Sequence, residues 1–127
     1  MAAIDKKGLS MFFTRVRPEV EYTVVAEPLS GIAGERLRSQ IRKSLQSGAH
    51  THIIDLRSLR TLDSYTLATL IRILRYVRAS NGSIGLIVDQ EPFLKILSIT
   101  ALDRVFPVFR DKETAMDSLK TIEDIPA

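Results

Sequence analysis

Residues 63–66 read DSYT and carry the side chains best suited to chemistry in this sequence. The hydroxyl of Ser64 can serve as a nucleophile, as a helix cap or as the acceptor of a phosphate. A serine nucleophile needs a base within hydrogen-bond reach, most often a histidine. The only histidines, His50 and His52, lie at the start of a predicted strand over 52–56, which separates them from Ser64 by roughly 15 Å at ~3.3 Å per residue. We therefore expect no catalytic residue and no enzyme activity.

The two histidines also have the i, i+2 spacing of a pair of metal ligands on an extended segment. A zinc or other transition-metal site needs further ligands, and the sequence has no cysteine and no third histidine. Gly31 and Gly34 lack the spacing and the lysine of a phosphate-binding loop. We expect no metal and no cofactor, and we interpret His50 and His52 as partly exposed loop residues.

Ser64 and Asp63 also stand where a helix is predicted to begin. Either side chain can accept a hydrogen bond from the free amide groups of the first turn. A phosphate on Ser64 would add a charge of about −1.5 to −2, which the helix amino end stabilises and which Asp63 or an acidic partner surface repels. On the residues alone, Ser64 is either part of a helix cap or a switch that controls binding.

The elements that must position this serine follow from hydrophobic periodicity. Alternating or continuous apolar runs predict strands at residues 11–17, 22–29, 52–56, 84–89 and 106–109. Pro107 restricts the last of these strands to an edge of the sheet. Apolar residues at helical spacing predict helices at residues 33–46, 64–79, 92–98 and 112–122. The order ββαβαβαβα predicts one α/β domain, with a mixed, mostly parallel sheet of about 4 or 5 strands layered with about 4 helices. Ser64 then lies at the carboxyl edge of that sheet, where functional groups tend to gather.

Charge is distributed unevenly around the net value of +3. Between residues 36 and 78 the acids Asp55 and Asp63 are outnumbered by bases, namely Arg36, Arg38, Arg42, Lys43, Arg57, Arg60, Arg72, Arg75 and Arg78. A surface with this excess of positive charge can attract a charged partner. The alternative is a solvated surface that binds no partner. We expect no direct binding of nucleic acid, because no recognition motif or aromatic platform accompanies the bases.

Length and composition predict one compact domain. The chain has 127 residues, enough to bury a core without disulfides or metals. We expect residues 1–10 to form a loose tail before a domain over 11–127. The absence of cysteine fits a reducing compartment, and no stretch approaches the ~20 apolar residues of a membrane span. We expect a soluble, cytoplasmic protein without membrane insertion, and a homodimer is one option for its assembly.

The run from HIIDL at 52–56 to ALDRVFPVF at 101–109 resembles a STAS domain, the module of bacterial anti-sigma factor antagonists that is also found attached to sulfate transporters. The similar features are the strand ending in IIDL, the turn LDS, the glycine-bounded NGSIGLIV and the leucine-rich helix after it. The resemblance covers essentially the whole chain, because the family has the same order of strands and helices.

In antagonists of this family the turn reads Asp-Ser, then a small residue, then Gly, and its serine is phosphorylated by a partner that is both kinase and anti-sigma factor. The resemblance places Asp63 and Ser64 at those positions, while Tyr65 and Thr66 depart from the pattern. It implies a non-enzymatic switch: the unmodified protein binds an anti-sigma factor, and phosphate at Ser64 cancels that binding. The expected partner-binding residues are the neighbours in the motif and exposed positions of the next helix, namely Asp63, Tyr65, Thr66, Arg72, Arg75 and Tyr76.

A second hypothesis keeps the fold and changes the role. Some STAS proteins are constitutive accessory subunits of ABC-type transport complexes, where the domain supports an ATPase subunit and the serine is no switch. Tyr65 and Thr66 favour this alternative, because both are larger than the residues that the switch motif prefers. The sequence leaves the two roles open.

Overall fold

The computed structural model describes residues 11–123, with side chains described through Ser118; the expected tail at 1–10 lies outside this range. The strands are β1 (Met11–Arg17), β2 (Val20–Val25), β3 (Thr51–Asp55), β4 (Ser83–Ile87) and β5 (Val108–Phe109). The helices are α1 (Ile32–Gln46), α2 (Ser64–Ala79), α3 (Glu91–Ile99), the short 3-10 helix η1 (Leu102–Arg104) and α4 (Lys112–Glu123). The predicted α/β class and the order of elements are confirmed.

The strands form one mixed sheet in the order β1-β2-β3-β4-β5. β1 pairs with β2 in antiparallel fashion, and the remaining neighbours are parallel. β5 follows Pro107 at the edge of the sheet, as predicted, and the carbonyl oxygen of Pro107 accepts a hydrogen bond from the amide of Leu86 at 2.9 Å. Proline fits there because it has an acceptor but no amide hydrogen to pair.

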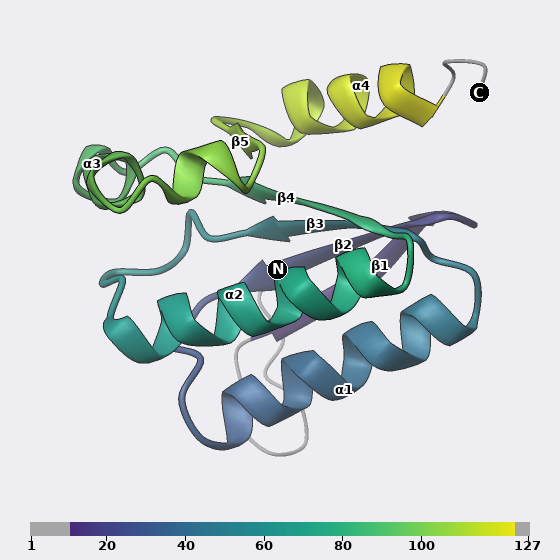
Figure 1. Ribbon diagram of the computed structural model, residues 1–127, viewed down its shortest axis with the longest axis horizontal. Helices are drawn as coiled ribbons and strands as arrows, with labels where there is room; N and C mark the ends of the chain where they lie inside the picture. Colours follow the sequence, from purple (N-terminus) through teal and green to yellow (C-terminus); the bar gives the residue numbers. More distant parts are fainter. Residues whose placement is uncertain (1–10, 124–127) are drawn as a thin grey trace.

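Helices cover both faces of the sheet. Figure 1 shows α1 and α2 on one face and α4 on the other. Alternate residues of β3 serve the two layers: Ile54 belongs to the large core beneath α1 and α2, whereas Ile53 packs with Ala115 of α4 in a smaller core. The near-continuous apolar sequence of β4 is explained by this double coverage.

The carboxyl edge of the sheet gathers the amino ends of three helices. β2, β3 and β4 are parallel, and each leads into the next helix at the same edge, so α1, α2 and α3 all begin there (Figure 1). Residues 56–63 connect β3 to α2 along this edge. Ser64, the first residue of α2, therefore lies at the same edge of the sheet as the starts of α1 and α3.

Three details of the fold differ from the sequence prediction. The second strand ends at Val25 rather than at residue 29, because Pro28 cannot donate to a ladder and Leu29 turns into the core. The last strand is shorter than predicted and begins at Val108. η1 was not predicted; it starts after Ala101, whose φ of 60° breaks the chain out of α3.

Candidate functional site

Ser64 is exposed at the first position of α2, and Asp63 is the residue that caps the helix. Asp63 has extended backbone angles, and its Oδ1 accepts a hydrogen bond from the amide of Thr66 at 2.8 Å. The sequence allowed either side chain to be the cap. Because the carboxylate takes that role, the helix does not depend on the hydroxyl of Ser64 for this bond.

Thr66 is fully buried, so the structure does not support its expected place on a binding surface. Its Oγ1 accepts a hydrogen bond from the amide of Leu29 at 3.0 Å. Thr69, one turn further along α2, donates from its hydroxyl to the carbonyl of Leu29, also at 3.0 Å. These two bonds fasten the loop before α1 to the first turns of α2, and both backbone groups of Leu29 are satisfied inside the core.

Sequence reasoning missed this attachment, although two signals were present. Thr66 and Thr69 are polar residues at i, i+3 on the buried stripe of α2, where an unpaired hydroxyl would be costly. A second signal was Gly34, which lies so close to the loop that a Cβ atom there would stand 2.7 Å from the carbonyl oxygen of Leu29. Glycine is therefore required for α1 to approach this segment.

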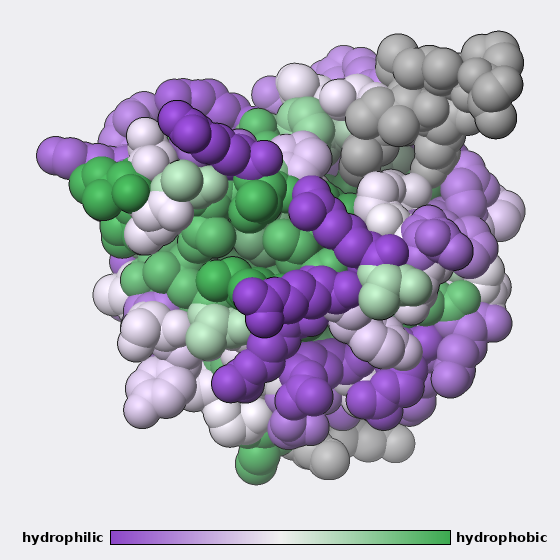
Figure 2. Space-filling view, in the orientation of Figure 1, coloured by the Kyte–Doolittle hydropathy of each residue, from purple (hydrophilic) through white to green (hydrophobic). Residues whose placement is uncertain are grey.

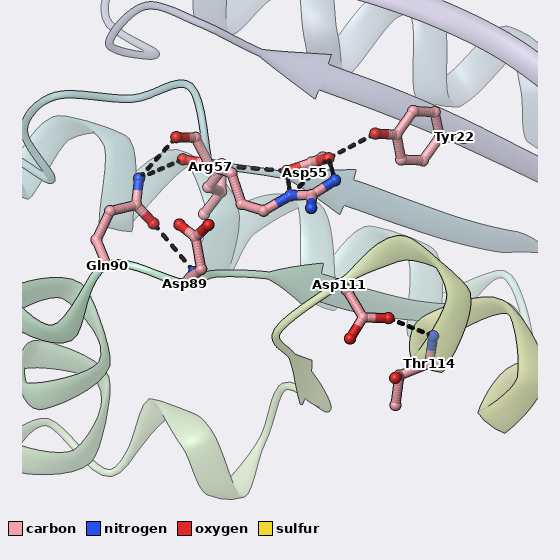
Figure 3. A network of polar contacts seen from close by, with 8 residues as sticks. Tyr22, Asp55, Arg57, Asp89, Gln90, Asp111 and Thr114 are labelled. Atoms are coloured by element: carbon pink, nitrogen blue, oxygen red, sulfur yellow. Dashed lines mark hydrogen bonds and ion pairs between the residues drawn. The ribbon is translucent and has the colours of Figure 1, made fainter.

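The loop from β3 to α2 is anchored at its start by Gln90, the residue before α3 (Figure 3). Its Nε2 amide lies 2.9 Å from the carbonyl oxygens of Leu56 and Leu59, and 3.2 Å from that of Arg57. Its Oε1 accepts a hydrogen bond from the amide of Asp89 at 3.2 Å. One side chain thus ties the amino end of α3 to the segment that leads toward Ser64.

A second polar network stands beside that anchor, at the end of β3 (Figure 3). Arg57 donates to the buried carboxylate of Asp55 through Nε at 3.0 Å and Nη2 at 2.7 Å, and its backbone amide donates to the same group at 3.0 Å. The hydroxyl of Tyr22 donates to Asp55 as well. Such a fork of charge-assisted bonds gives the loop a fixed direction as it leaves the strand.

The network shifts the ionisation of its members. Burial would raise the pKa of the Asp55 carboxyl, but the hydrogen bonds from Arg57 and Tyr22 outweigh it and hold that pKa below its usual value. Burial and the adjacent Asp55 carboxylate raise the pKa of Tyr22 to about 12. At neutral pH the site therefore holds a carboxylate, a guanidinium and a neutral phenol.

The histidines lie at the opposite edge of the sheet, and one of them corrects the sequence interpretation. His50 is exposed, but His52 lies on β3 and is only 1% exposed. Its Nε2 is 2.9 Å from the carbonyl oxygen of Ala49, and its Nδ1 has no hydrogen-bond partner among the described residues. Burial lowers the pKa of His52, so this residue is a neutral core side chain and not a loop histidine.

The other expected partner-binding residues are exposed along α2. Tyr65 is 70% exposed and Tyr76 is 43% exposed, and Arg72 and Arg75 are exposed between them. Tyr65, Arg72 and Tyr76 follow the spacing i, i+7, i+11 and share the side of the helix that faces α1. Arg75 points further out from the sheet.

The opposite side of α2 borders an apolar band. Leu67 and Ile71 are only partly buried there, and so are Leu102 and Val105 of the η1 segment. Nη2 of Arg78 donates to the carbonyl of Val105 at 2.6 Å, which holds the two segments side by side. Figure 2 shows this band between α2 and α3, with hydrophilic side chains over α1 and α2 next to it.

No cluster of three or more His, Cys, Asp or Glu side chains suited to a metal ion occurs among the described residues. Nor does the described part of the chain contain a helix long and apolar enough to cross a membrane.

The fold and the site define a class of protein: a single-sheet α/β module that presents an exposed serine at the start of a helix on the carboxyl edge of its sheet. The STAS domain family matches residues 15–115 of the sequence. The chain therefore belongs to the STAS family.

Comparisons with individual proteins agree with this assignment. A putative anti-sigma factor antagonist of Thermotoga maritima is 26% identical over 76 residues, which cover 60% of this chain and 67% of the relative. The crystal structure of a putative anti-sigma factor antagonist from the same organism has a TM-score of 0.74 at 20% identity, over 87% of this chain and 94% of that one. The unphosphorylated form of the anti-sigma factor antagonist SpoIIAA has a TM-score of 0.72 at 20% identity, over 87% of this chain and 96% of its own.

Proposed function

We propose that this protein is an anti-sigma factor antagonist, a regulatory binding protein rather than an enzyme, whose partner binding is switched by phosphorylation at Ser64. One observation carries the proposal: Ser64 is exposed at the amino end of α2, while Asp63 supplies the helix cap. A phosphate can be added and removed there without breaking the bond that begins the helix. Modification then changes the surface more than it changes the fold.

The family relatives supply the partner in this proposal. The Thermotoga relative is described as a putative anti-sigma factor antagonist. SpoIIAA, which shares the fold, has been solved in an unphosphorylated and in a phosphorylated form. By analogy, the partner of this chain is an anti-sigma factor that also acts as the serine kinase.

The binding surface in this proposal surrounds the start of α2. Tyr65 projects beside Ser64, the apolar band with Leu67 and Ile71 continues along one side of α2, and Arg72 continues along the other. Aromatic and arginine residues are favoured at the centres of interfaces. A partner that covers this surface also buries Ser64.

The phosphate acts on that surface by charge. A group with a charge of about −1.5 to −2 next to the Asp63 carboxylate adds strong local negative potential, which the positive end of the helix compensates only in part. A partner bound over this point would remove the phosphate and the Asp63 carboxylate from water, which is costly without new cationic contacts. Phosphorylation is therefore expected to release the partner.

The accessory-subunit alternative loses one of its two sequence arguments. The side chain of Thr66 is buried and bonded to Leu29, so its size does not hinder a kinase that approaches Ser64 from solvent. Tyr65 is still a large exposed neighbour. If tagged protein retrieves transporter subunits with unmodified Ser64, that result would favour the alternative.

The proposal is tested by titration calorimetry with the anti-sigma factor that co-purifies with the protein. We expect Ser64→Ala to bind as wild type and Ser64→Glu to bind at least about tenfold more weakly, a difference of about 1.4 kcal/mol. Gln46→Glu is the control, because it adds the same charge on an exposed position at the far end of α1. Equal affinities of the two Ser64 variants would contradict the switch.

A further inference from the structure

α1 and α2 lie side by side on one face of the sheet (Figure 1), and side chains of both helices line two hollows between them. Arg38, Arg42 and Tyr76 line a small hollow of about 50 Å³ at one end, above Ile41 and Ile73. Arg38 also lines the adjoining hollow with Tyr65 and Arg72. We define the α1–α2 groove by these residues: Arg38, Ile41, Arg42, Tyr65, Arg72, Ile73 and Tyr76.

Positive charge dominates the two helices that form the groove. Glu35 is the only acidic residue in the sequence of α1, and α2 contains none. The carboxylate of Glu35 is already paired with Arg38 at 2.8 Å. Glu35 therefore compensates Arg38, and the positive charges of Arg42 and Arg72 are left without an acidic partner on either helix.

Two arginines of the groove lack the internal partners that several other arginines of the fold have. Arg57 is bound to Asp55, Arg78 to the carbonyl of Val105, and Arg110 to Glu91. The guanidinium groups of Arg42 and Arg72, in contrast, make no hydrogen bond or ion pair within the part of the chain that the structure describes. These guanidinium groups are therefore free to donate hydrogen bonds to an acceptor on another molecule.

We infer that the α1–α2 groove docks an acidic, partly apolar segment of a protein partner. Arginine pairs with carboxylates through two parallel hydrogen bonds, and the tyrosines with the isoleucine floor offer contacts to aliphatic side chains. The distance from Tyr65 to Tyr76 along α2 is about 16 Å at ~1.5 Å per residue. That length matches about three turns of a partner helix or about five extended residues.

The same groove is a poor site for single-stranded nucleic acid. Successive bases stack on aromatic rings that lie close together. Here Tyr65 and Tyr76 stand about 16 Å apart along the helix, with Arg72 between them.

This inference rests on the proposed function for one point only, that the segment belongs to the regulatory partner. Binding by the groove itself is tested without that partner. The probe is a fluorescent helical peptide of about 12 residues made of Glu and Leu, compared with a Lys and Leu peptide and a single-stranded RNA of similar length. Fluorescence anisotropy at low and at high salt measures the affinities.

The decisive variant reverses two free cations, Arg42→Glu with Arg72→Glu. Its matched control is Lys95→Glu with Arg104→Glu, which changes the net charge equally on exposed positions of α3 and η1. We expect the Glu and Leu peptide to bind wild type in a salt-sensitive way. The groove variant is expected to weaken binding at least about tenfold, and the control by less than about twofold.

Three results would overturn the inference: no binding of the acidic peptide, equal loss in the groove variant and the control, or tighter binding of the RNA with the same dependence on the groove. Thermal unfolding followed by circular dichroism confirms that the variants are folded. If the groove fails while Ser64→Glu still releases the partner, only the groove is rejected. If the groove binds and Ser64→Glu has no effect, only the phosphoswitch is rejected.

Discussion

Thr66 illustrates how a single residue can look like part of a functional motif and serve the fold instead. Its hydroxyl is the acceptor for the buried amide of Leu29. The residue sits two positions after Ser64, so the exposed and the buried roles alternate within one turn of α2. Because the side chain of Thr66 is buried, having threonine here in place of the glycine of the family motif does not enlarge the exposed surface beside Ser64.

Replacing this hydroxyl tests the structural role of Thr66. Thr66→Val keeps the shape but leaves the Leu29 amide without its acceptor, so we expect a loss of about 1–3 kcal/mol in the free energy of unfolding. Urea unfolding measures it, and Thr61→Val at an exposed position is the control. An unchanged midpoint for Thr66→Val would show that the buried amide finds another partner.

His52 makes a prediction about pH. Its pKa in the fold lies below the unfolded value of 6.5, because burial disfavours the charged ring. The unfolded chain therefore binds a proton before the folded chain does, and stability present above pH 6.5 is lost as pH falls toward the folded pKa. Urea unfolding between about pH 5 and pH 8 should show this loss in wild type and in His50→Gln, and less of it in His52→Gln. If the loss of stability at low pH disappears in His50→Gln and persists in His52→Gln, the prediction is wrong, because the effect then comes from His50.

At the scale of elements, the loop from β3 to α2 connects the sheet to the helix that begins with Ser64. Gln90 and the Asp55–Arg57 pair fix the first part of this loop. Because Gln90 also precedes α3, a movement of α3 would reach the loop through one side chain. The loop is therefore predicted to be as ordered as the strands it follows.

Removing the amide of Gln90 tests this anchor. Gln90→Ala leaves the carbonyl oxygens of Leu56 and Leu59 without their shared donor, and we expect faster hydrogen exchange in peptides that span residues 56–63. Exchange in α1 should be unchanged. Gln46→Ala, an exposed glutamine of α1, is the matched control. Equal protection of the loop in wild type and Gln90→Ala would mean that Asp55 and Arg57 hold it alone.

The elements also show which parts of the fold are visible in a sequence. α2 was predicted with its observed bounds, because a long apolar stripe and an Asp-Ser start are local signals. The end of β2 and the 3-10 helix η1 were not, because Leu29 is held by Thr66 and Thr69, some forty residues away, and η1 depends on one left-handed residue, Ala101. Ser64 and Tyr65 are exposed as expected, whereas Thr66 is buried, and the bond that it makes to Leu29 could not be read from the sequence.

At the scale of the molecule, the two sides of α2 have different chemistry. One side borders the apolar band toward η1, and the other forms the basic α1–α2 groove. Ser64 lies at the amino end of α2, where the apolar band and the α1–α2 groove both begin. A charge added at that point lies next to both surfaces, which is a physical reason for one serine to control a broad interface.

The most direct test of the central claim is mass spectrometry of tagged protein recovered from its own cells, reading the co-purified proteins and the modification of Ser64 together. We predict an anti-sigma factor kinase among the retrieved proteins, phosphate on a fraction of Ser64, and partner only on the unmodified fraction. Transporter subunits bound to protein whose Ser64 is never modified would contradict it.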